Sequence, residues 1–538
     1  MAEIDIAVVG AGFSGLYLLH RLRSDGFRVQ VIEAGGDLGG TWYWNRYPGL
    51  RCDIESLQYC YSFSDDLQRE WHWSERYASQ AEILRYLNHV AERFDLRRDI
   101  AFNTRATAAN WDETAGRWRV VTERGAPVVA RVLIMASGPL SQPNLPDIKG
   151  IGDFAGPIYH TGKWPHEPVD FTGRNVAVIG TGSSGIQAIP LIARQARQLT
   201  VFQRTANFVV PAWNRPMDRA EQDAYQAHHA NNREQLRWSP GGYRIDLHDE
   251  PLMSLPRDVV LAELERRWQL GGLPFTHIYP DTKTDRAANE VVAEFLRGKI
   301  RRRVKDPQTA ERLVPHGYPF GTKRLCVDTD YFETFNRPNV SLVDLTQTPI
   351  LQIAARSLRT RERSIDAETI VLATGFDAVT GALLAVDLRG RGGVALRDVW
   401  SAGPKSYLGL MVAGFPNLFT ITGPTSPSIL SNVAVSIEQH VEWIADCLGH
   451  MRARTLDCIE PEPAAEADWV ARCHALAAAT FFPEAASWYM GANIPGKPRV
   501  MLPFTGGVGV YRGICNDIAA KGYDGFRLSA GACPGGGA

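Results

Sequence analysis

A short apolar run, a glycine turn and an amphipathic segment open the sequence. Ile6–Val9 contains no polar residue, which is typical of a parallel strand covered on both faces. Leu16–Leu22 has the pattern of an amphipathic helix, and Arg28–Ile32 has that of a second strand. The pattern predicts a strand–turn–helix–strand unit.

The same order of elements recurs in the middle of the chain. Asn175–Ile179 is an apolar strand, Ile186–Ile192 begins a helix, and Leu199–Phe202 is the next strand. Two further apolar strands end in small residues and glycine, within Met135–Pro139 (MASGP) and Val371–Asp377 (VLATGFD). Such turns are typical of points where a chain crosses between two nucleotide-binding domains.

Both turns have the GxGxxG spacing that accommodates a dinucleotide. The first set is Gly10, Gly12 and Gly15, and the second is Gly180, Gly182 and Gly185. In each set one glycine makes the tight turn, one lets a pyrophosphate approach the backbone, and one lets the helix pack against the strand. The N-terminus of the following helix adds amide donors and partial positive charge.

The residue that ends the second strand differs between the two units. Glu33 ends the first, where a carboxylate can accept hydrogen bonds from a ribose diol. Arg204 stands near the corresponding place in the second and suits a 2′-phosphate, with which it can form a charge-assisted pair. We therefore predict FAD in the first unit and NADPH in the second.

These patterns predict an α/β fold with two Rossmann-like dinucleotide-binding domains. The segment after the second unit lacks strand patterning and contains helical stretches such as RAANEVVAEFLRGKIRRRV, so we expect a helical insertion in the NADP domain. The expected parts are an FAD-binding domain (1–142 and 377–528), an NADP-binding domain (143–210 and 320–376), the insertion (211–319) and a disordered glycine-rich tail (529–538).

Composition limits the classes of partner. The 58 basic and 59 acidic residues nearly cancel, so we expect no nucleic acid and no membrane surface as a partner. No apolar run approaches the roughly 18 residues that a membrane helix needs. The eight cysteines have neither a CxxC pair nor metal-ligand spacing, so we expect reduced thiols, no metal and a cytoplasmic location.

Two denser motifs narrow the chemistry. FAGPIYHTGKWP (Phe154–Pro165) has the form FxGxxxHxxxWP, and GGTWYWNRYPGLRCD (Gly39–Asp53) has the form GGxWxxxxYPGxxxD. With GTKRLCVDTDYFETFNRPNV (Gly321–Val340), they make the chain from Ile4 to Phe526 resemble the type I Baeyer–Villiger monooxygenases, whose fingerprint is the first motif. The segments GPTSPSILSNVAVSIEQHVEW and WYMGANIPGKPR are most similar to the branch that acts on aryl and cyclic ketones.

The resemblance implies a reaction and two catalytic residues. It implies an enzyme that uses FAD, NADPH and dioxygen to convert a small ketone to an ester or lactone, and that also oxidises sulfides. We expect a monomer or a weak homo-oligomer. In this family the reduced flavin forms a C4a-peroxide, which must stay anionic to attack the ketone. The resemblance implies that Arg324 stabilises this anion, because arginine keeps its charge, and that Asp53 holds the guanidinium by paired hydrogen bonds.

The resemblance also implies which other residues meet the cofactors. Those expected to line the FAD site, besides the glycines and Asp53, are Ser14, Glu33, Thr41, Trp42, Tyr43, Trp44, Tyr59 and Val433. Those expected at the pyrophosphate of NADPH are Thr181, Gly182, Ser183, Ser184, Gly185, Ile186 and Gln187. Lys323 is expected on the 2′-phosphate beside Arg204 and Thr205, while Arg51, Cys52 and Trp488 are expected to contact NADP.

Three further segments receive a structural interpretation. The resemblance places His160 in the linker between the domains, so we expect it to position or couple them and not to act as a general base. Ser426–Val433 is predicted to be an active-site loop, and Gly491–Arg499 a mobile lid over NADP. The basic run Arg301–Arg303 is expected to be a solvated helix face.

Three alternatives stand beside this hypothesis. A flavin monooxygenase that oxygenates amines or sulfides would share both glycine turns and a similar histidine motif, but it would need neither the Trp164–Pro165 ending nor the Asp53–Arg324 pair. A disulfide reductase would need paired cysteines near the first helix, and the sequence has none there. A flavin-binding interaction protein would not bind NADPH and so would not need Arg204 and Lys323.

Overall fold

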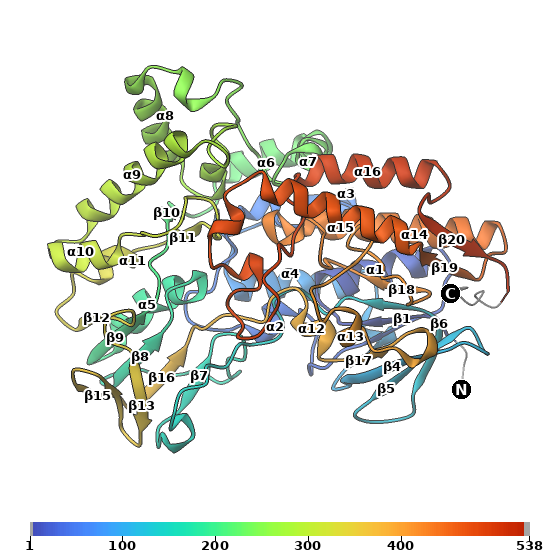
Figure 1. Cartoon of the computed structure of the whole chain (residues 1–538), viewed down its shortest axis with the longest axis horizontal. Helices are drawn as coiled ribbons and strands as arrows, with labels where there is room; N and C mark the ends of the chain where they lie inside the picture. Colours follow the sequence, from blue (N-terminus) through green and yellow to red (C-terminus); the bar gives the residue numbers. More distant parts are fainter. Residues whose placement is uncertain (1–3, 532–538) are drawn as a thin grey trace.

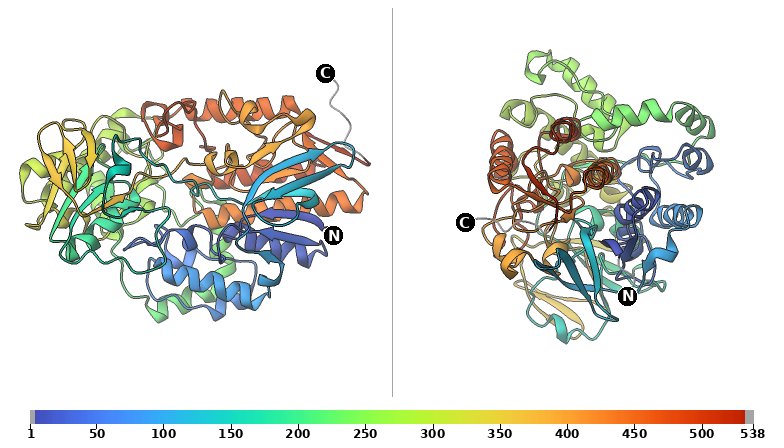
Figure 2. Two further views of the ribbon diagram at one scale, coloured as in Figure 1. Left: turned by 90° about the horizontal axis from the view of Figure 1, so that it is seen from below. Right: turned by 90° about the vertical axis from the view of Figure 1, so that its right-hand side faces the viewer.

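The computed structural model describes residues 4–531, which form two sheet-containing units beneath a layer of helices (Figure 1). The strands of the first unit lie at one end of the molecule and those of the second unit at the other, as the view from below in Figure 2 shows. The expected α/β fold with two Rossmann-like units is confirmed.

The first sheet combines strands from distant parts of the chain. Its order is β17-β4-β5-β6-β1-β2-β3, with β18 paired to β6. Strands β1, β2, β3 and β6 pair in parallel around the first glycine turn, whereas β4 and β5 form an antiparallel extension. The bounds are β1 (Ile4–Val9), β2 (Val29–Ile32), β3 (Ile100–Ala101), β4 (Ala106–Asp112), β5 (Arg117–Thr122), β6 (Val128–Met135), β17 (Asp387–Arg389) and β18 (Leu418–Thr420).

The second sheet is parallel throughout, in the order β12-β9-β8-β16-β7. Its strands are nearly continuous apolar runs because helices or a small sheet cover both faces. The bounds are β7 (Ile158–His160), β8 (Asn175–Ile179), β9 (Gln198–Gln203), β12 (Val340–Asp344) and β16 (Thr369–Leu372). A separate antiparallel sheet contains β13 (Ile350–Ala354), β14 (Ser357–Thr360) and β15 (Ser364–Asp366).

Helix α1 (Phe13–Ser24) follows the first glycine turn and α5 (Ser183–Gln195) follows the second. Each is preceded by a glycine in extended conformation, Gly12 or Gly182, and neither has a side-chain cap. Their first backbone N–H groups are therefore left for another acceptor. Helix α14 (Val433–Ala453) packs along α1, and most of its residues are buried.

Helices form the segment predicted as an insertion. It leaves β10 (Val209–Pro211) and returns at β11 (Cys326–Asp328), and these two short strands pair in parallel. Between them lie α6 (Arg219–Ala227), α7 (His229–Trp238), α8 (Arg257–Leu270), α9 (Arg286–Arg303) and α10 (Pro307–Leu313). Lys323 and Arg324 lie two to three residues before β11, so the returning strand determines where these two cations lie.

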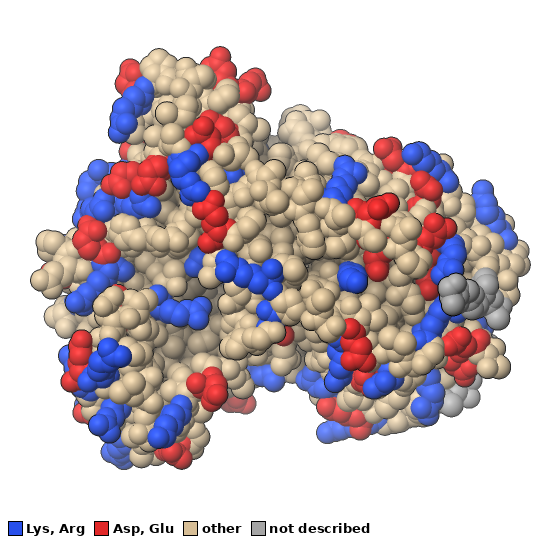
Figure 3. All heavy atoms as spheres, in the orientation of Figure 1, with Lys and Arg blue, Asp and Glu red and all other residues tan. Residues whose placement is uncertain are grey.

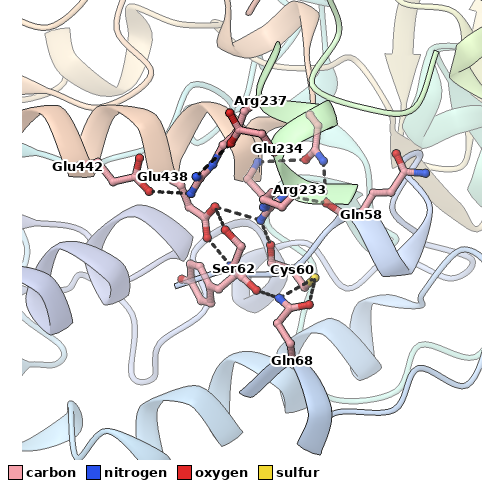
Figure 4. A network of polar contacts seen from close by, with 12 residues as sticks. Gln58, Cys60, Ser62, Gln68, Arg233, Glu234, Arg237, Glu438 and Glu442 are labelled. Carbon is pink, nitrogen blue, oxygen red and sulfur yellow. Dashed lines mark hydrogen bonds and ion pairs between the residues drawn. The ribbon is translucent and has the colours of Figure 1, made fainter. Parts of the chain in front are cut away.

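A buried ion pair attaches the insertion to the first unit (Figure 4). Arg233 of α7 lies 3.1 Å from Glu438 of α14, and their side chains are only 8% and 2% exposed. Glu438 also accepts hydrogen bonds from the backbone and hydroxyl of Ser62, and Arg233 donates to the carbonyl of Cys60. Since an unpaired charge at this depth would cost about 3–5 kcal/mol, the pair holds α7 in one position against α14.

The chain crosses between the units at two adjacent segments. Asn144 N–H donates to the carbonyl of Gly375 at 2.9 Å, and Asp377 N–H donates to that of Gln142 at 2.8 Å. The first segment lies between β6 and β7, and the second lies between β16 and β17. The hydrogen bonds between them mean that the two crossings cannot shift independently.

The remaining helices surround these units. In the first half of the chain they are α2 (Thr41–Trp44), α3 (Asp65–Glu70) and α4 (Gln80–Arg93), and later α11 (Tyr331–Thr334), α12 (Gly381–Leu384), α13 (Leu396–Val399), α15 (Pro463–Ala478) and α16 (Val508–Ala520). Strands β19 (Cys458–Pro461) and β20 (Phe526–Ser529) close the described chain.

Two expectations need correction. Ser529 was assigned to a disordered tail but it pairs with Cys458 in the last strand; residues 532–538 of that tail lie outside the described residues. Cys458 is disulfide-bonded, whereas reduced thiols were expected throughout. Six other cysteines are free and buried, as expected: Cys52, Cys60, Cys326, Cys447, Cys473 and Cys515.

Candidate active site

Arg324 and Asp53 form a two-pronged ion pair between the segment that precedes β11 and the second motif. Arg324 Nε donates to one carboxylate oxygen of Asp53 at 2.9 Å, and Nη2 donates to the other at 2.8 Å. Nη1 donates to the carbonyl of Ile429 at 3.3 Å, which brings the predicted loop Ser426–Val433 to the same point. The guanidinium is thus held by two segments that are remote in sequence.

The environment keeps this guanidinium charged. Burial opposes the charged form, but the Asp53 carboxylate outweighs it and raises the pKa of Arg324 above its ordinary value. The phenols of Tyr489 and Tyr243 also face Arg324, and burial raises the pKa of Tyr243 to about 12. The site therefore contains a permanent cation flanked by neutral hydroxyl groups.

Arg324 lines a cavity of about 160 Å³. Its other walls come from the insertion, from the loop before α14 and from the C-terminal part of the chain, and include Tyr243, Leu273, Leu430, Tyr489 and Phe504. A cavity of roughly 150 Å³ accommodates benzene, so this one has room for a molecule of about one ring.

The first glycine turn fits the pyrophosphate of a dinucleotide. A Cβ on Gly10 or Gly15 would strike backbone oxygen at 2.5 or 1.8 Å, so both glycines are needed for packing. Gly12 faces only Gly40, at 3.4 Å from where its Cβ would lie, and this leaves a strip without side chains at the N-terminus of α1. Glu33 is buried behind the turn. One of its carboxylate oxygens accepts a hydrogen bond from Ala11 N–H at 2.7 Å, and the other accepts one from Gly35 N–H at 2.6 Å. Each carboxylate oxygen can accept a second hydrogen bond.

Aromatic residues of the second motif pack beside this turn. Trp42 donates through its indole N–H to the Tyr59 hydroxyl at 3.3 Å, and the Tyr59 ring contacts Phe13 of α1. Burial raises the pKa of Tyr59, so it remains a neutral phenol. Of the other residues expected here, Thr41, Tyr43 and Trp44 belong to α2, Ser14 is buried in α1, and Val433 is the first residue of α14.

The second glycine turn has the same geometry with a more open centre. A Cβ on Gly180 or Gly185 would come within 2.3 Å of backbone oxygen, whereas one on Gly182 would meet nothing within 4 Å. Thr181 donates to the carbonyl of Thr205 at 3.2 Å, which ties the turn to the end of β9. Gly182, Ser183 and Ser184 thus lie at an open helix N-terminus, the arrangement that binds phosphate.

Two cations meet near this turn without an acid between them. Burial and the neighbouring Arg204 lower the pKa of Lys323 to about 8. The Lys323 ammonium lies 4.3 Å from the ring centroid of Tyr318. Arg204 is exposed and, within residues 4–531, has no ion pair or hydrogen bond of its own. A pair of like charges held together fits a site whose ligand supplies the anion.

The motif around Asp53 also joins the two units. Gln187 of α5 accepts from the Tyr47 hydroxyl at 2.9 Å and donates to the carbonyl of Arg51 at 3.1 Å. The Arg51 guanidinium forms an ion pair with Glu75 at 2.6 Å, and Cys52 is a buried thiol whose pKa burial raises. The segment that positions Asp53 is therefore docked on the helix that follows the second turn.

His160 lies where the two crossings meet. Its Nδ1 accepts from Gly162 N–H at 2.9 Å, so Nε2 carries the proton and donates to the Thr374 hydroxyl at 3.2 Å. Thr374 in turn donates to the carbonyl of Asn144 at 2.6 Å. Burial lowers the pKa of His160, so the ring is neutral near pH 7. The imidazole links both crossing segments and is not directed at the cavity of Arg324.

The sequence did not assign a role to some residues of the site. Tyr243, Tyr489 and the carbonyl of Ile429 contact or face Arg324. Ile429 lies in the predicted active-site loop and Tyr489 in the segment WYMGANIPGKPR, whereas Tyr243 belongs to no recognisable motif. Trp488 is half-buried beside Tyr489, at 4.4 Å between ring centroids, in the η9 turn (Trp488–Met490). The segment Gly491–Arg499, expected to be a lid, contains neither helix nor strand.

The surface is of mixed charge. On the face drawn in Figure 3, acidic and basic side chains are interspersed, and Lys and Arg border a hollow between the second unit and the rest of the molecule. Within the described range, no helix has the length and apolar character required to cross a lipid bilayer.

Comparison with known proteins supplies the family context. The family model for flavin-binding monooxygenase-like proteins matches residues 3–220. A Baeyer–Villiger monooxygenase of Pseudooceanicola batsensis is 41% identical over 526 residues, which cover 97% of this chain and 96% of the relative. An oxidised steroid monooxygenase bound to NADP is 50% identical with a TM-score of 0.94, over 98% of this chain and 100% of that one. OTEMO in complex with FAD and NADP is 39% identical with a TM-score of 0.95, over 98% and 99%.

Proposed function

Because the chain belongs to the type I Baeyer–Villiger monooxygenases, we propose that it oxidises small ketones to esters or lactones with Arg324 and Asp53 as its catalytic pair. It is an FAD-containing, NADPH-dependent monooxygenase. The observation that carries the residue assignment is the paired hydrogen bonding of Arg324 to Asp53 at the wall of a one-ring cavity.

The residues described above fit both cofactors. Glu33, Gly12 and the N-terminus of α1 would hold the ribose and pyrophosphate of FAD, beside Trp42 and Tyr59. Gly182 and α5 would hold the pyrophosphate of NADPH, and Arg204 with Lys323 its 2′-phosphate. The two cofactors, when bound there, would supply the hydride transfer and the oxygen activation that the reaction requires.

The protein's own contribution is charge and placement. Arg324 keeps a positive charge at the cavity wall throughout the cycle, where it stabilises negative charge that develops on oxygen. Asp53 occupies one edge of the guanidinium and so fixes its orientation. Of the five guanidinium N–H groups, Asp53 accepts from two and the carbonyl of Ile429 from one, so one on Nη1 and one on Nη2 are left to donate to the substrate oxygen.

His160 acts at a distance. Its ring fixes both crossing segments through Thr374, and these segments set the position of one unit relative to the other. We therefore assign it a positioning role, since it does not face the cavity.

The alternative function is oxygenation of an amine or sulfide. That chemistry has an electron-rich atom as the substrate and gains nothing from a fixed cation that stabilises oxyanion charge. The half-buried Arg324–Asp53 pair therefore favours ketone oxidation as the main activity and sulfide oxidation as a secondary one.

Product analysis tests this assignment. The holoenzyme is given NADPH, ¹⁸O₂ and cyclic, aromatic or linear ketones, and mass spectrometry should find ester or lactone with one ¹⁸O atom. Arg302→Ala, at an exposed position of α9, is the control and should match the parent. Release of hydrogen peroxide alone, with every ketone recovered unchanged, would contradict the proposed function.

A further inference from the structure

Besides Arg324 and Lys323, a third cation lies at this cavity, on the loop before α9. Lys283 lines the cavity, and its ammonium lies 3.1 Å from His277 Nε2. The other ring nitrogen, Nδ1, lies 2.8 Å from the Thr276 hydroxyl and 3.0 Å from that of Tyr243. Tyr243 in turn faces Arg324, so one chain of polar groups runs along the wall from Lys283 toward the catalytic pair.

The direction of the hydrogen bonds can be assigned. Burial, followed by the charge of Lys283, lowers the pKa of His277 well below its ordinary value, so the ring is neutral. Lys283 has only donors, and His277 Nε2 must therefore accept, which leaves the proton on Nδ1. Of the three N–H bonds of the ammonium, one is used in this way and two remain for another acceptor.

No acid neutralises Lys283 in the structure as described. The charged residues that line the cavity are Lys283, Lys323 and Arg324, and the lining contains neither Asp nor Glu. The nearest acids in sequence are engaged elsewhere: Asp281 accepts from Leu252 N–H at 3.0 Å, and Asp285 caps α9 through Ala288 N–H at 2.9 Å. Desolvation alone lowers the pKa of Lys283 to about 8, so it is still protonated at pH 7.

The three cations differ in whether they already have an anionic partner or remain available to bind a substrate. Asp53 compensates Arg324, and Lys323 lies beside Arg204, where the proposed function places the 2′-phosphate of NADPH. Of the three cations in this lining, Lys283 is the one that pairs neither with a carboxylate of the described residues nor with the 2′-phosphate of NADPH. Lys283 is half-buried at the cavity wall. A partly desolvated ammonium without an anion is unfavourable, which indicates that the ligand brings the negative charge.

We propose that Lys283 is a specificity-determining residue that binds a carboxylate on the substrate, so that the enzyme acts on small cyclic keto acids. The inference rests on the proposed function: the ketone carbonyl faces Arg324 and the carboxylate faces Lys283 across the same cavity. A volume of about 160 Å³ limits such a substrate to about one ring with a short acidic substituent.

Binding without turnover provides the first test. Isothermal titration calorimetry of the oxidised holoenzyme with NADP⁺ would compare cyclohexanecarboxylate with its neutral analogue cyclohexanecarboxamide. The parent should bind the carboxylate about 10- to 100-fold more tightly, the range of a charge-assisted hydrogen bond. Lys283→Met should abolish this preference, Lys283→Arg should restore part of it, and Lys305→Met, at an exposed position of the insertion, should retain it. Equal affinity of the parent for both ligands would overturn the proposal, even if Lys283→Met cannot be purified.

Turnover provides the second test. The ratio of kcat/KM for 4-oxocyclohexanecarboxylate to that for 4-methylcyclohexanone should exceed about 10 in the parent and approach 1 in Lys283→Met. If the parent enzyme turned over 4-methylcyclohexanone normally but showed no preference for the keto acid, the role of Lys283 would be rejected and the proposed function would be kept. Failure with both ketones, combined with selective binding of the carboxylate in the calorimeter, would reject the proposed function and keep the anion site. In a third outcome, Lys283→Met would keep the preference for the carboxylate in both assays but would raise the Michaelis constant for NADPH. That result would assign Lys283 to the binding of the nicotinamide nucleotide instead.

Discussion

Arg324 donates two parallel hydrogen bonds to Asp53, at 2.9 and 2.8 Å, although the two residues are 271 positions apart in the sequence. The carboxylate belongs to the motif that docks on α5, and the guanidinium to the segment that returns from the helical insertion. The contact therefore joins the motif docked on α5 to the segment that follows the insertion.

Arg324→Ala should still allow NADPH to reduce the bound flavin, but product formation should fall at least 10²–10³-fold, the effect of losing one preorganised donor of about 3–4 kcal/mol. Asp53→Asn keeps the shape and removes the charge that orients the guanidinium, so product formation should fall less steeply. Stopped-flow absorbance separates flavin reduction from ester formation. If Arg324→Ala formed ester at the parental rate, the assigned role would be wrong.

Affinity for NADPH should fall as the pH rises through about 8. Burial, together with Arg204, depresses the pKa of Lys323 from its ordinary value to about 8 in the free enzyme. The ammonium is present below that pH and is lost above it, whereas a 2′-phosphate is already doubly charged above a pKa of about 6. The Michaelis constant for NADPH should thus increase above pH 8, and that for NADH, which lacks the phosphate, should not.

Neutral substitution of the same cations provides the matching control. Arg204→Gln and Lys323→Gln should each raise the Michaelis constant for NADPH by roughly 10- to 100-fold, as expected for loss of a hydrogen bond to a charged group. The dependence on pH near 8 should vanish in Lys323→Gln. An equal loss with NADH would remove the argument for a phosphate site.

Two glycines of one turn should respond differently to alanine. In Gly182→Ala the new methyl group meets no protein atom within 4 Å, so thermal stability should be close to that of the parent while the Michaelis constants for NADPH and NADH both rise. In Gly185→Ala the methyl group would lie 2.2 Å from the carbonyl of Gly180, so the folded yield should collapse. Differential scanning calorimetry with steady-state kinetics distinguishes the two, and equal Tm losses would show that the turn is not open at Gly182.

His160 and Thr374 should act as one unit. His160→Ala and Thr374→Val each remove the hydrogen bond that joins the crossing segments, and each should divert NADPH oxidation from ester to hydrogen peroxide by about 2- to 10-fold, while the FAD content stays the same. Because both changes break one contact, the double variant should be no worse than either single variant. Additive effects would mean that the two residues act separately.

Local patterns accounted for much of the fold. The predicted strand Asn175–Ile179 has those bounds in the structure, and both glycine turns lie between a parallel strand and a helix, as their spacing required. The last strand was missed, because Phe526–Ser529 is short and its pairing partner, Cys458–Pro461, is distant in sequence. Likewise no local pattern indicated the disulfide at Cys458.

The sequence by itself determined the two dinucleotide turns, the acid at one and the arginine at the other, since these depend on residues within about 25 positions and on the periodicities of strand and helix. Only the tertiary structure decided which charged groups meet. The approach of Lys323 to Arg204, the link from His160 through Thr374 to Asn144, and the unmatched Lys283 at the cavity all arise when distant segments pack together. Such contacts have no short-range signal, because the energy that forms them comes from burial of the whole chain and not from the propensity of any segment.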